Sequence, residues 1–481
     1  MADSLKQKTI SSMIWSVVER FSTQGVQFLF SLVLARLLTP HDYGVIGMLA
    51  IFMAVSQVFI DSGFSNALIR KTDRTETDNS TAFYFNIVVG GVAYGFLWLI
   101  SPLIAGFFAT PVLEPLVKVV ALNVILNSLC VVQTAQLTLR LDFRTQAKIS
   151  LISAVITGVV GITLAWRGYG VWALAWQGVT SGVVRTVLLW WLGSWRPREG
   201  FSWDSFRELF GYGSRLLAAA LLNTFYTNIY QIIIGKLFDA RLLGLYTRAQ
   251  QFATLPSSNV TGIIQRVTFP VLSTIQNEDE RLCSSYRRLL KMSAFIIFPM
   301  MTLLAAVAAP LVELLLTAKW NGCIILLQII CFNMMWHPIH AINLNLLQVK
   351  GRSDLFLKLE IAKKILGIII LCVTMPLGLI AMCVGQVVSS YLCLIINTYY
   401  TGKLIRVGYF MQMRDVLPIL ANSLVLCVLA LGAVHLTAGN LFCQLVAGCL
   451  TGSAYYIVSN ALLRTDEYVE LVQMLKGRKD K

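Results

Sequence analysis

The stretch SSMIWSVVERFSTQGVQFLFSLVLAR, residues 11–36, decides the fold class. At about 1.5 Å per residue it is long enough to cross a bilayer as one helix, and it is mostly apolar. It nevertheless contains Glu19 and Arg20, and charges at such depth usually face the interior of a helix bundle or a watery cavity. The residues that follow Arg20 on the same helical face are polar: Gln24, Gln27 and Ser31. This pattern predicts a membrane helix that lines a pathway for an anionic group.

The composition extends this interpretation to the whole chain. Of its 481 residues, 57% are hydrophobic and only 13% are charged, whereas a soluble domain carries about 25% charged residues. We therefore predict an all-α integral membrane protein. We interpret the N-terminus as the first mature helix, because no A-x-A site closes a short apolar core as in a cleaved signal. The ten cysteines form no C-x-x-C pair, so we expect core side chains rather than disulfides or metal ligands.

Apolar segments recur along the chain and predict about fourteen transmembrane helices. Their approximate ranges are 11–36, 43–66, 82–108, 113–138, 147–166, 169–193, 210–235, 241–269, 290–317, 321–348, 355–375, 378–401, 415–435 and 440–463.

Basic residues indicate the orientation of these segments. Most of the 39 Lys and Arg residues lie in the N-terminus, the loops after even-numbered segments and the C-terminal tail. The opposite side carries few: Arg36, Lys118, Arg167, Lys236, Arg241 and Lys319. The positive-inside rule then places both termini in the cytoplasm. The formal net charge of +15 is thus a consequence of topology, and we expect no nucleic-acid partner.

The two halves of the chain resemble each other. At an offset of 200 residues, LARLLTPHDYGVIG (34–47) aligns with IGKLFDARLLGLYT (234–247), which matches Gly44 with Gly244. Two six-helix repeats predict a transporter architecture with the site between the lobes. Pro197 and Gly200 interrupt regular structure between them. The predicted divisions are a first lobe (1–195), an interfacial cytoplasmic linker (196–208), a second lobe (209–405), a peripheral helix pair (406–464) and a cytoplasmic tail (465–481).

Three further arginines lie within apolar segments. Arg185 shares a helical face with Gln177 and sits deep in its segment, whereas Arg215 and Arg248 lie nearer helix ends. A deep arginine points to an anion pathway, but one near a helix end can instead extend to the membrane surface. Both interpretations stay open for Arg215 and Arg248.

Carboxylates and histidines in the segments have competing interpretations. Glu19 could couple an ion or serve as a counter-ion, and Asp61 could couple an ion or only contact solvent. His337 and His340 are expected to be polar packing groups, because no carboxylate or cysteine accompanies them at metal-ligand spacing. The sequence contains no nucleotide-binding G-x-x-x-x-G-K-[ST] loop, and no nucleophile stands beside a base. We therefore predict no enzyme activity, cofactor or metal.

Four patterns carry a family resemblance: LARLLTPHDYGVIGMLAIF (34–52), DSGFSNALIRK (61–71), GLYTRAQQFATLP (244–256) and VTFPVLSTIQ (267–276). With them, the whole chain resembles the Wzx-type polysaccharide flippases of the multidrug/oligosaccharidyl-lipid/polysaccharide exporter superfamily, most of all the colanic-acid exporters. The resemblance implies two six-helix lobes around a cationic cavity, plus two peripheral helices. It also implies flipping of undecaprenyl-pyrophosphate-linked oligosaccharides across the bacterial inner membrane for surface polysaccharide synthesis.

The resemblance also assigns candidate residues and partners. Arg20 and Arg248 match positions where related flippases carry cavity arginines, and guanidinium groups bind pyrophosphate oxygens bidentately. Our own reading adds Gln24, Gln27, Arg185 and Arg215 to this substrate-binding set. Polysaccharide polymerase and chain-length proteins are expected partners, beside membrane lipids.

Three alternatives compete with this function. A drug exporter of the same superfamily should carry deep acidic residues to hold a cation, whereas the deep charge here is mainly arginine. A polymerase or ligase enzyme should carry a large periplasmic loop, and the outward loops here are short. A passive scaffold does not explain polar stripes that contain arginine.

Overall fold

A computed structural model covers the chain and describes residues 22–61, 68, 71, 73–437 and 439–476. The described part is almost entirely helical, and within it every predicted apolar segment coincides with a helix or with consecutive helices. Ten segments of the described residues are long and apolar enough to span a membrane. The described helix over 22–37 and the helices of three other predicted segments are not among these ten. The integral membrane class is confirmed, while the number of fourteen spans stays a prediction.

Contacts divide the chain into two compact units, Met1–Gly244 and Leu245–Lys481. After the helix over 22–37, the first unit contains α2 (Pro40–Asp61), α4 (Glu76–Phe107), α5 (Leu113–Val120), α6 (Leu122–Ser128), α7 (Val131–Leu139), α8 (Phe143–Trp166), α9 (Val171–Leu192) and α10 (Trp203–Leu237).

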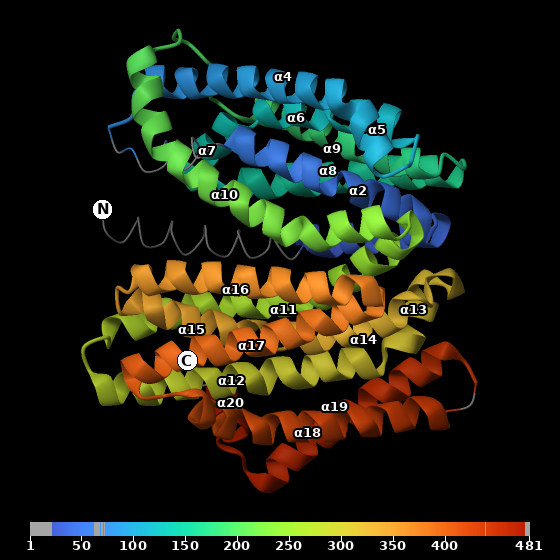
Figure 1. Cartoon of the computed structure of the whole chain (residues 1–481), viewed down its shortest axis with the longest axis vertical. Coiled ribbons are helices and arrows are strands. Elements are labelled where there is room, and N and C mark those ends of the chain that lie inside the picture. The colour runs from blue at the N-terminus through green and yellow to red at the C-terminus, as the bar shows by residue number, and fades with distance from the viewer. Residues whose placement is uncertain (1–21, 62–67, 69–70, 72, 438, 477–481) are drawn as a thin grey trace. The chain divides into compact units, whose positions relative to one another are not determined.

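Helix α2 occupies the centre of the first unit. It packs against α10, α4 and α9, while α8 lies along α9 (Figure 1). Glycines permit the close approach of α8 and α9, since a Cβ atom on Gly161 would lie 3.0 Å from Cδ of Gln177. The fourth predicted segment is not one helix but three short ones, α5 to α7, which turn at Ala121 and at Leu129–Cys130.

The second unit continues from α11 (Ala240–Thr274), whose first turn lies in the first unit. Its other elements are α12 (Asp279–Ala306), α13 (Ala308–Leu316), the 3-10 turn η1 (Ala318–Trp320), α14 (Cys323–Met334), α15 (His337–Val349), α16 (Ser353–Thr374), the 3-10 turn η2 (Met375–Leu377), α17 (Leu379–Ile405), α18 (Tyr409–Leu436), α19 (Leu441–Leu463) and α20 (Asp466–Lys476).

Helix α12 organises the second unit. It packs along α18 and also contacts α14 and α15. Arg287 of α12 forms a bidentate ion pair with Asp415 of α18, with N–O distances of 2.7 and 2.6 Å. Arg288 of the same helix pairs with Glu470 of α20. Helix α20 is thus fastened to α12, and α18 packs against both α12 and α19.

Helix α11 contains two prolines. In the sequence, Pro256 suggests an interruption of the predicted segment 241–269, but α11 continues through both Pro256 and Pro270. Membrane helices tolerate such prolines when neighbouring groups bond the disturbed backbone. Beside Pro256, the Ser257 hydroxyl donates to the Met334 carbonyl at 2.7 Å. A side chain of α11 thereby anchors it to the end of α14 at this point.

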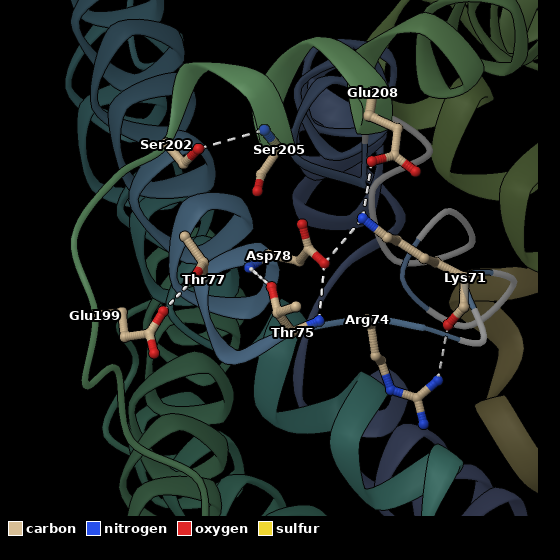
Figure 2. A network of polar contacts seen from close by, with 9 residues as sticks. All are labelled: Lys71, Arg74, Thr75, Thr77, Asp78, Glu199, Ser202, Ser205 and Glu208. Carbon is tan, nitrogen blue, oxygen red and sulfur yellow. Dashed lines mark hydrogen bonds and ion pairs between the residues drawn. The ribbon is translucent and has the colours of Figure 1, made fainter.

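A polar network joins the segment before α4 to the segment before and within α10 (Figure 2). Thr75 and Asp78 form a capping box at the start of α4. The Lys71 ammonium lies 3.0 Å from the Asp78 carboxylate and 2.8 Å from that of Glu208. The hydrogen bond to Glu208, with Asp78 adding to it, raises the pKa of Lys71 above its usual value. Lys71 therefore ties α10 to α4.

The same network bears on the predicted linker. The indole of Trp195 donates to Glu76 at 2.7 Å, and Thr77 donates to Glu199 (Figure 2 shows the latter pair). Ser202 caps α10, so the last part of the predicted linker 196–208 is helical. Helix α10 packs on α2 and α4, although the repeat assigns it to the second lobe. The lobes were predicted from the repeat in the sequence, whereas the two units are defined by contacts in the structure. The lobe boundaries therefore stay a prediction.

Candidate functional site

The predicted site residues are described to different degrees. Glu19 and Arg20 lie outside the described residues. Arg215 lies within α10, but its side chain is not described. In the helix over 22–37, Gln24 is half-buried and Gln27 is exposed. The structure can therefore place the side chains of Gln24, Gln27, Asp61, Arg185 and Arg248 only.

In the first unit, the structure brings Asp61 and Arg185 together. Gln57 lies one turn before Asp61 on α2 and donates to its carboxylate at 3.1 Å. Gln57 in turn accepts a hydrogen bond from Asn127 of α6 at 2.9 Å. Arg185 of α9 lies within electrostatic range of Asp61. Asp61, Gln57 and Asn127 thus form a hydrogen-bonded relay between α2 and α6, with Arg185 of α9 nearby, an arrangement that the sequence interpretation did not anticipate.

Arg185 is exposed, whereas Gln177, predicted to lie on the same face of α9, is less exposed. Gln177 is half-buried, and its side chain lies against Gly161 of α8. The i, i+8 spacing placed both residues on one face, but the groove that Gly161 leaves in α8 accepts the long amide. Of the two polar residues predicted to share one face of α9, only Arg185 is therefore exposed.

In the second unit, Arg248 is only 3% exposed. Its Nη1 atom donates to Oε1 of Gln251 at 2.8 Å, and its guanidinium carbon lies 5.4 Å from the ring centroid of Trp320. Trp320 is itself fully buried. An arginine stacked on an aromatic ring is attracted by the ring quadrupole and is more weakly hydrated than an ammonium. Arg248 therefore has internal partners and does not extend to the membrane surface.

The two predicted histidines pack against polar groups. His337 lies 3.1 Å from the Thr261 hydroxyl. The two ring nitrogens of His340 lie 3.1 Å from Ser390 and from Asn397, both on α17. These contacts agree with polar packing between α15, α11 and α17, and no metal-binding group of His, Cys, Asp or Glu occurs among the described residues.

A larger buried cluster lies beside His340 and was missed in the sequence. Asn343 and Gln412 exchange hydrogen bonds at 3.1 and 3.2 Å, and Thr401 donates to Asn343 at 2.7 Å. These residues join α15, α17 and α18. Polar residues one turn apart, as Asn397 and Thr401 are on α17, were the available signal. The cluster cross-links three helices, because amides buried in a membrane protein find partners on neighbouring helices.

Comparison with known proteins decides the family. Residues 33–325, more than half of the chain, match the family described as "Polysaccharide biosynthesis protein". The chain belongs to this family.

Curated relatives of the chain come from several bacteria. It is 28% identical to the lipopolysaccharide biosynthesis protein WzxC of Escherichia coli (strain K12), over 86% of this chain and 82% of that protein. It is 25% identical to the teichuronic acid biosynthesis protein TuaB of Bacillus subtilis (strain 168), over 73% of each chain. It is 24% identical to the succinoglycan biosynthesis transport protein ExoT of Rhizobium meliloti (strain 1021), over 66% of this chain and 65% of that protein.

Solved structures show the fold. The lipid II flippase MurJ superposes with a TM-score of 0.76 and 13% identity, covering 94% of this chain and 99% of MurJ. An inward-facing MATE transporter of the MOP superfamily superposes with a TM-score of 0.62 and 15% identity, covering 82% of this chain and all of that one. This member of the polysaccharide biosynthesis family thus has a MurJ-like and MATE-like helical membrane fold, in the fold class predicted from its sequence.

Proposed function

We propose that this protein flips undecaprenyl-pyrophosphate-linked oligosaccharide repeat units from the cytoplasmic to the periplasmic leaflet of the bacterial inner membrane. The observation that carries the proposal is the family match over residues 33–325. Relatives named for lipopolysaccharide, teichuronic acid and succinoglycan biosynthesis support it, because these pathways make surface polysaccharides.

The chemistry of the spans supports an anionic substrate. A pyrophosphate must cross a layer of low dielectric, where guanidinium groups compensate its charge through paired hydrogen bonds. We assign this role to Arg20, Arg185 and Arg215, with Gln24 and Gln27 contacting the sugar or phosphate. Arg185 is the member of this set whose exposed guanidinium is described.

Within this proposal, Arg248 has a different role from the other arginines. Its stacking on Trp320 and its bond to Gln251 hold the guanidinium inside the second unit. It contributes a positive potential to the pathway, and it contacts the pyrophosphate directly once its side chain leaves Trp320.

The mechanism is alternating access by rocking of the two lobes, with the sugar in the wet cavity and the lipid tail in the bilayer. Both termini lie in the cytoplasm. Glu19 couples transport to a proton or sodium gradient, and Asp61 either shares this role or neutralises Arg185. Polysaccharide polymerase and chain-length proteins receive the product. The protein carries out no covalent chemistry.

A leaflet assay tests this function. The protein is reconstituted in liposomes with a labelled undecaprenyl-pyrophosphate oligosaccharide, and the accessibility of the label on the far side is followed. We expect protein-dependent transfer that is lost in Arg20→Ala and Arg185→Gln. Arg281→Gln is the matched control, since Arg281 is 68% exposed and pairs only locally with Glu278 among the contacts described.

The same liposomes distinguish a drug exporter. Extrusion of a cationic dye under an ion gradient, without transfer of the oligosaccharide lipid, would contradict the proposal. Normal transfer in both Arg20→Ala and Arg185→Gln would leave flipping intact but overturn the cationic pathway.

A further inference from the structure

The first unit contains a groove between α2, α4 and α10, which all contact one another and can be followed in Figure 1. Its volume is about 910 Å³. Phenylalanines from all three helices line it, together with aliphatic side chains of α4, and Ser56 is its one polar lining residue. Many of these side chains are open to the outside, since Val92 is 67% exposed and Phe96 is 60% exposed. In a membrane protein, such a groove faces lipid.

The groove is too long for a lipid tail from one leaflet. On α4 it runs from Val88 to Phe107 along one continuous face. At 1.5 Å per residue this distance is about 28 Å, close to the roughly 30 Å thickness of the hydrocarbon core. A phospholipid acyl chain reaches only about half of that thickness. The groove therefore fits a single apolar chain that extends through both leaflets.

A cation stands at one end of the groove. Lys236, at the end of α10, places its ammonium 4.7 Å from the ring centroid of Phe107 and donates to the Phe107 carbonyl. Phe107 is the last lining residue on α4. Among the described residues no acidic partner of Lys236 is found within ion-pair distance, and its side chain is exposed. Two ammonium donors can therefore serve a phosphate at this end.

We propose that this groove holds the polyprenyl tail of the transported lipid, with the pyrophosphate beside Lys236. The proposal rests on the function proposed above and adds a tail site to it. An extended polyprenyl chain is long enough to fill the groove along its whole length, which a single acyl chain is not, and its phosphate complements the cation at the Phe107 end. In the predicted orientation Lys236 lies on the periplasmic side, so this arrangement holds the lipid after its head group has crossed.

Photo-crosslinking tests the tail site. The full chain in nanodiscs is irradiated with a polyprenyl pyrophosphate that carries a benzophenone in its tail, and crosslinked peptides are mapped. We expect labelling of α4 between Val88 and Phe107. Val92→Trp fills the groove and should reduce labelling about tenfold, since burial of a few methylene groups is lost. Leu99→Trp is the control, because Leu99 is 77% exposed on the same helix but does not line the groove.

Lys236→Gln tests the head group end independently. It should weaken binding of the pyrophosphate probe about tenfold, as expected for one charge-assisted hydrogen bond, and leave binding of the uncharged polyprenol probe unchanged. Equal losses for both probes would overturn the assignment of Lys236.

Three results would overturn the tail site: labelling confined to other helices, equal labelling in Val92→Trp and Leu99→Trp, or equal competition by phosphatidylglycerol and unlabelled polyprenyl pyrophosphate. The leaflet assay, run in parallel, separates the two proposals. Labelling of α4 without transfer would contradict flipping and support the tail site, whereas transfer without labelling of α4 would contradict the tail site alone.

Discussion

Gly44 and Gly244 lie against each other's helix in equivalent positions. A Cβ atom on Gly44 would stand 1.5 Å from the carbonyl oxygen of Ala240, and one on Gly244 would stand 1.8 Å from that of Pro40. Pro40 and Ala240 are themselves the first residues of α2 and α11. The offset of 200 residues that relates the two halves in sequence therefore also relates the two sides of one contact. Each glycine is required because backbone occupies the space of its side chain.

We expect Gly44→Ala to lower the free energy of unfolding by about 2 kcal/mol, since a methyl group at this contact must push α2 and α11 apart. Gly244→Ala should do the same. Thermal unfolding in detergent measures both. The control is Gly91→Ala on α4, where a Cβ atom meets nothing within 4 Å. There, alanine should be neutral or slightly stabilising, as in any open helix position. Equal stability of all three variants would contradict the contact.

Arg248→Ala should lower stability as well as transport. It removes the hydrogen bond to Gln251 and the packing on Trp320, which together contribute about 2 kcal/mol. Transfer must therefore be compared per folded protein, measured by size-exclusion recovery. Trp320→Leu serves as a matched variant that removes the ring but keeps the charge. If Arg248 acts only as a packing residue, the two variants lose transfer equally; we expect a larger loss in Arg248→Ala.

Lys71→Met should cost about 1–2 kcal/mol, because the nearly buried Asp78 loses a charged partner. Since the pKa of Lys71 is raised in the folded protein, its contribution is complete below its ordinary pKa and is lost as pH rises through the raised value. The difference between Lys71→Met and the parent should therefore be constant from about pH 6 to 9. Unfolding at several pH values measures it. Arg281→Met, at an exposed pair, should cost less than about 0.5 kcal/mol.

Asp61→Asn tests the pairing with Arg185. It keeps a side chain that can bond Gln57 but removes the negative charge within range of Arg185. We expect tighter binding of the anionic lipid, because Arg185 loses its competing counter-ion, with transfer still dependent on an ion gradient. The leaflet assay, run with and without proton or sodium gradients, distinguishes a counter-ion role of Asp61 from a role in ion coupling. A gradient dependence that disappears in Asp61→Asn would instead make Asp61 the coupling residue.

The helices and their polar residues were predictable from sequence, because the apolar runs match the bilayer thickness and interruptions by charge are rare. Contacts between distant segments were not predictable from the sequence. The sequence shows Arg248 inside an apolar helix, but only the fold brings Trp320 over its guanidinium. Likewise the spacing of Gln177 and Arg185 predicted a shared face, while the gap at Gly161 draws Gln177 toward α8. Pro256 likewise suggested an interruption of its helix, but α11 continues through it, and the neighbouring Ser257 contacts the end of α14.

The tie between Lys71 and Glu208 has a consequence for how the chain is made. Its two residues are 137 positions apart, yet both belong to the first unit, which ends at Gly244. Every contact of α10 with α2 and α4 can therefore form without any residue of the second unit. Domains generally fold in the order of synthesis. The first unit can thus assemble while the second is still being synthesised, and the tie between Lys71 and Glu208 forms once Glu208 has left the ribosome.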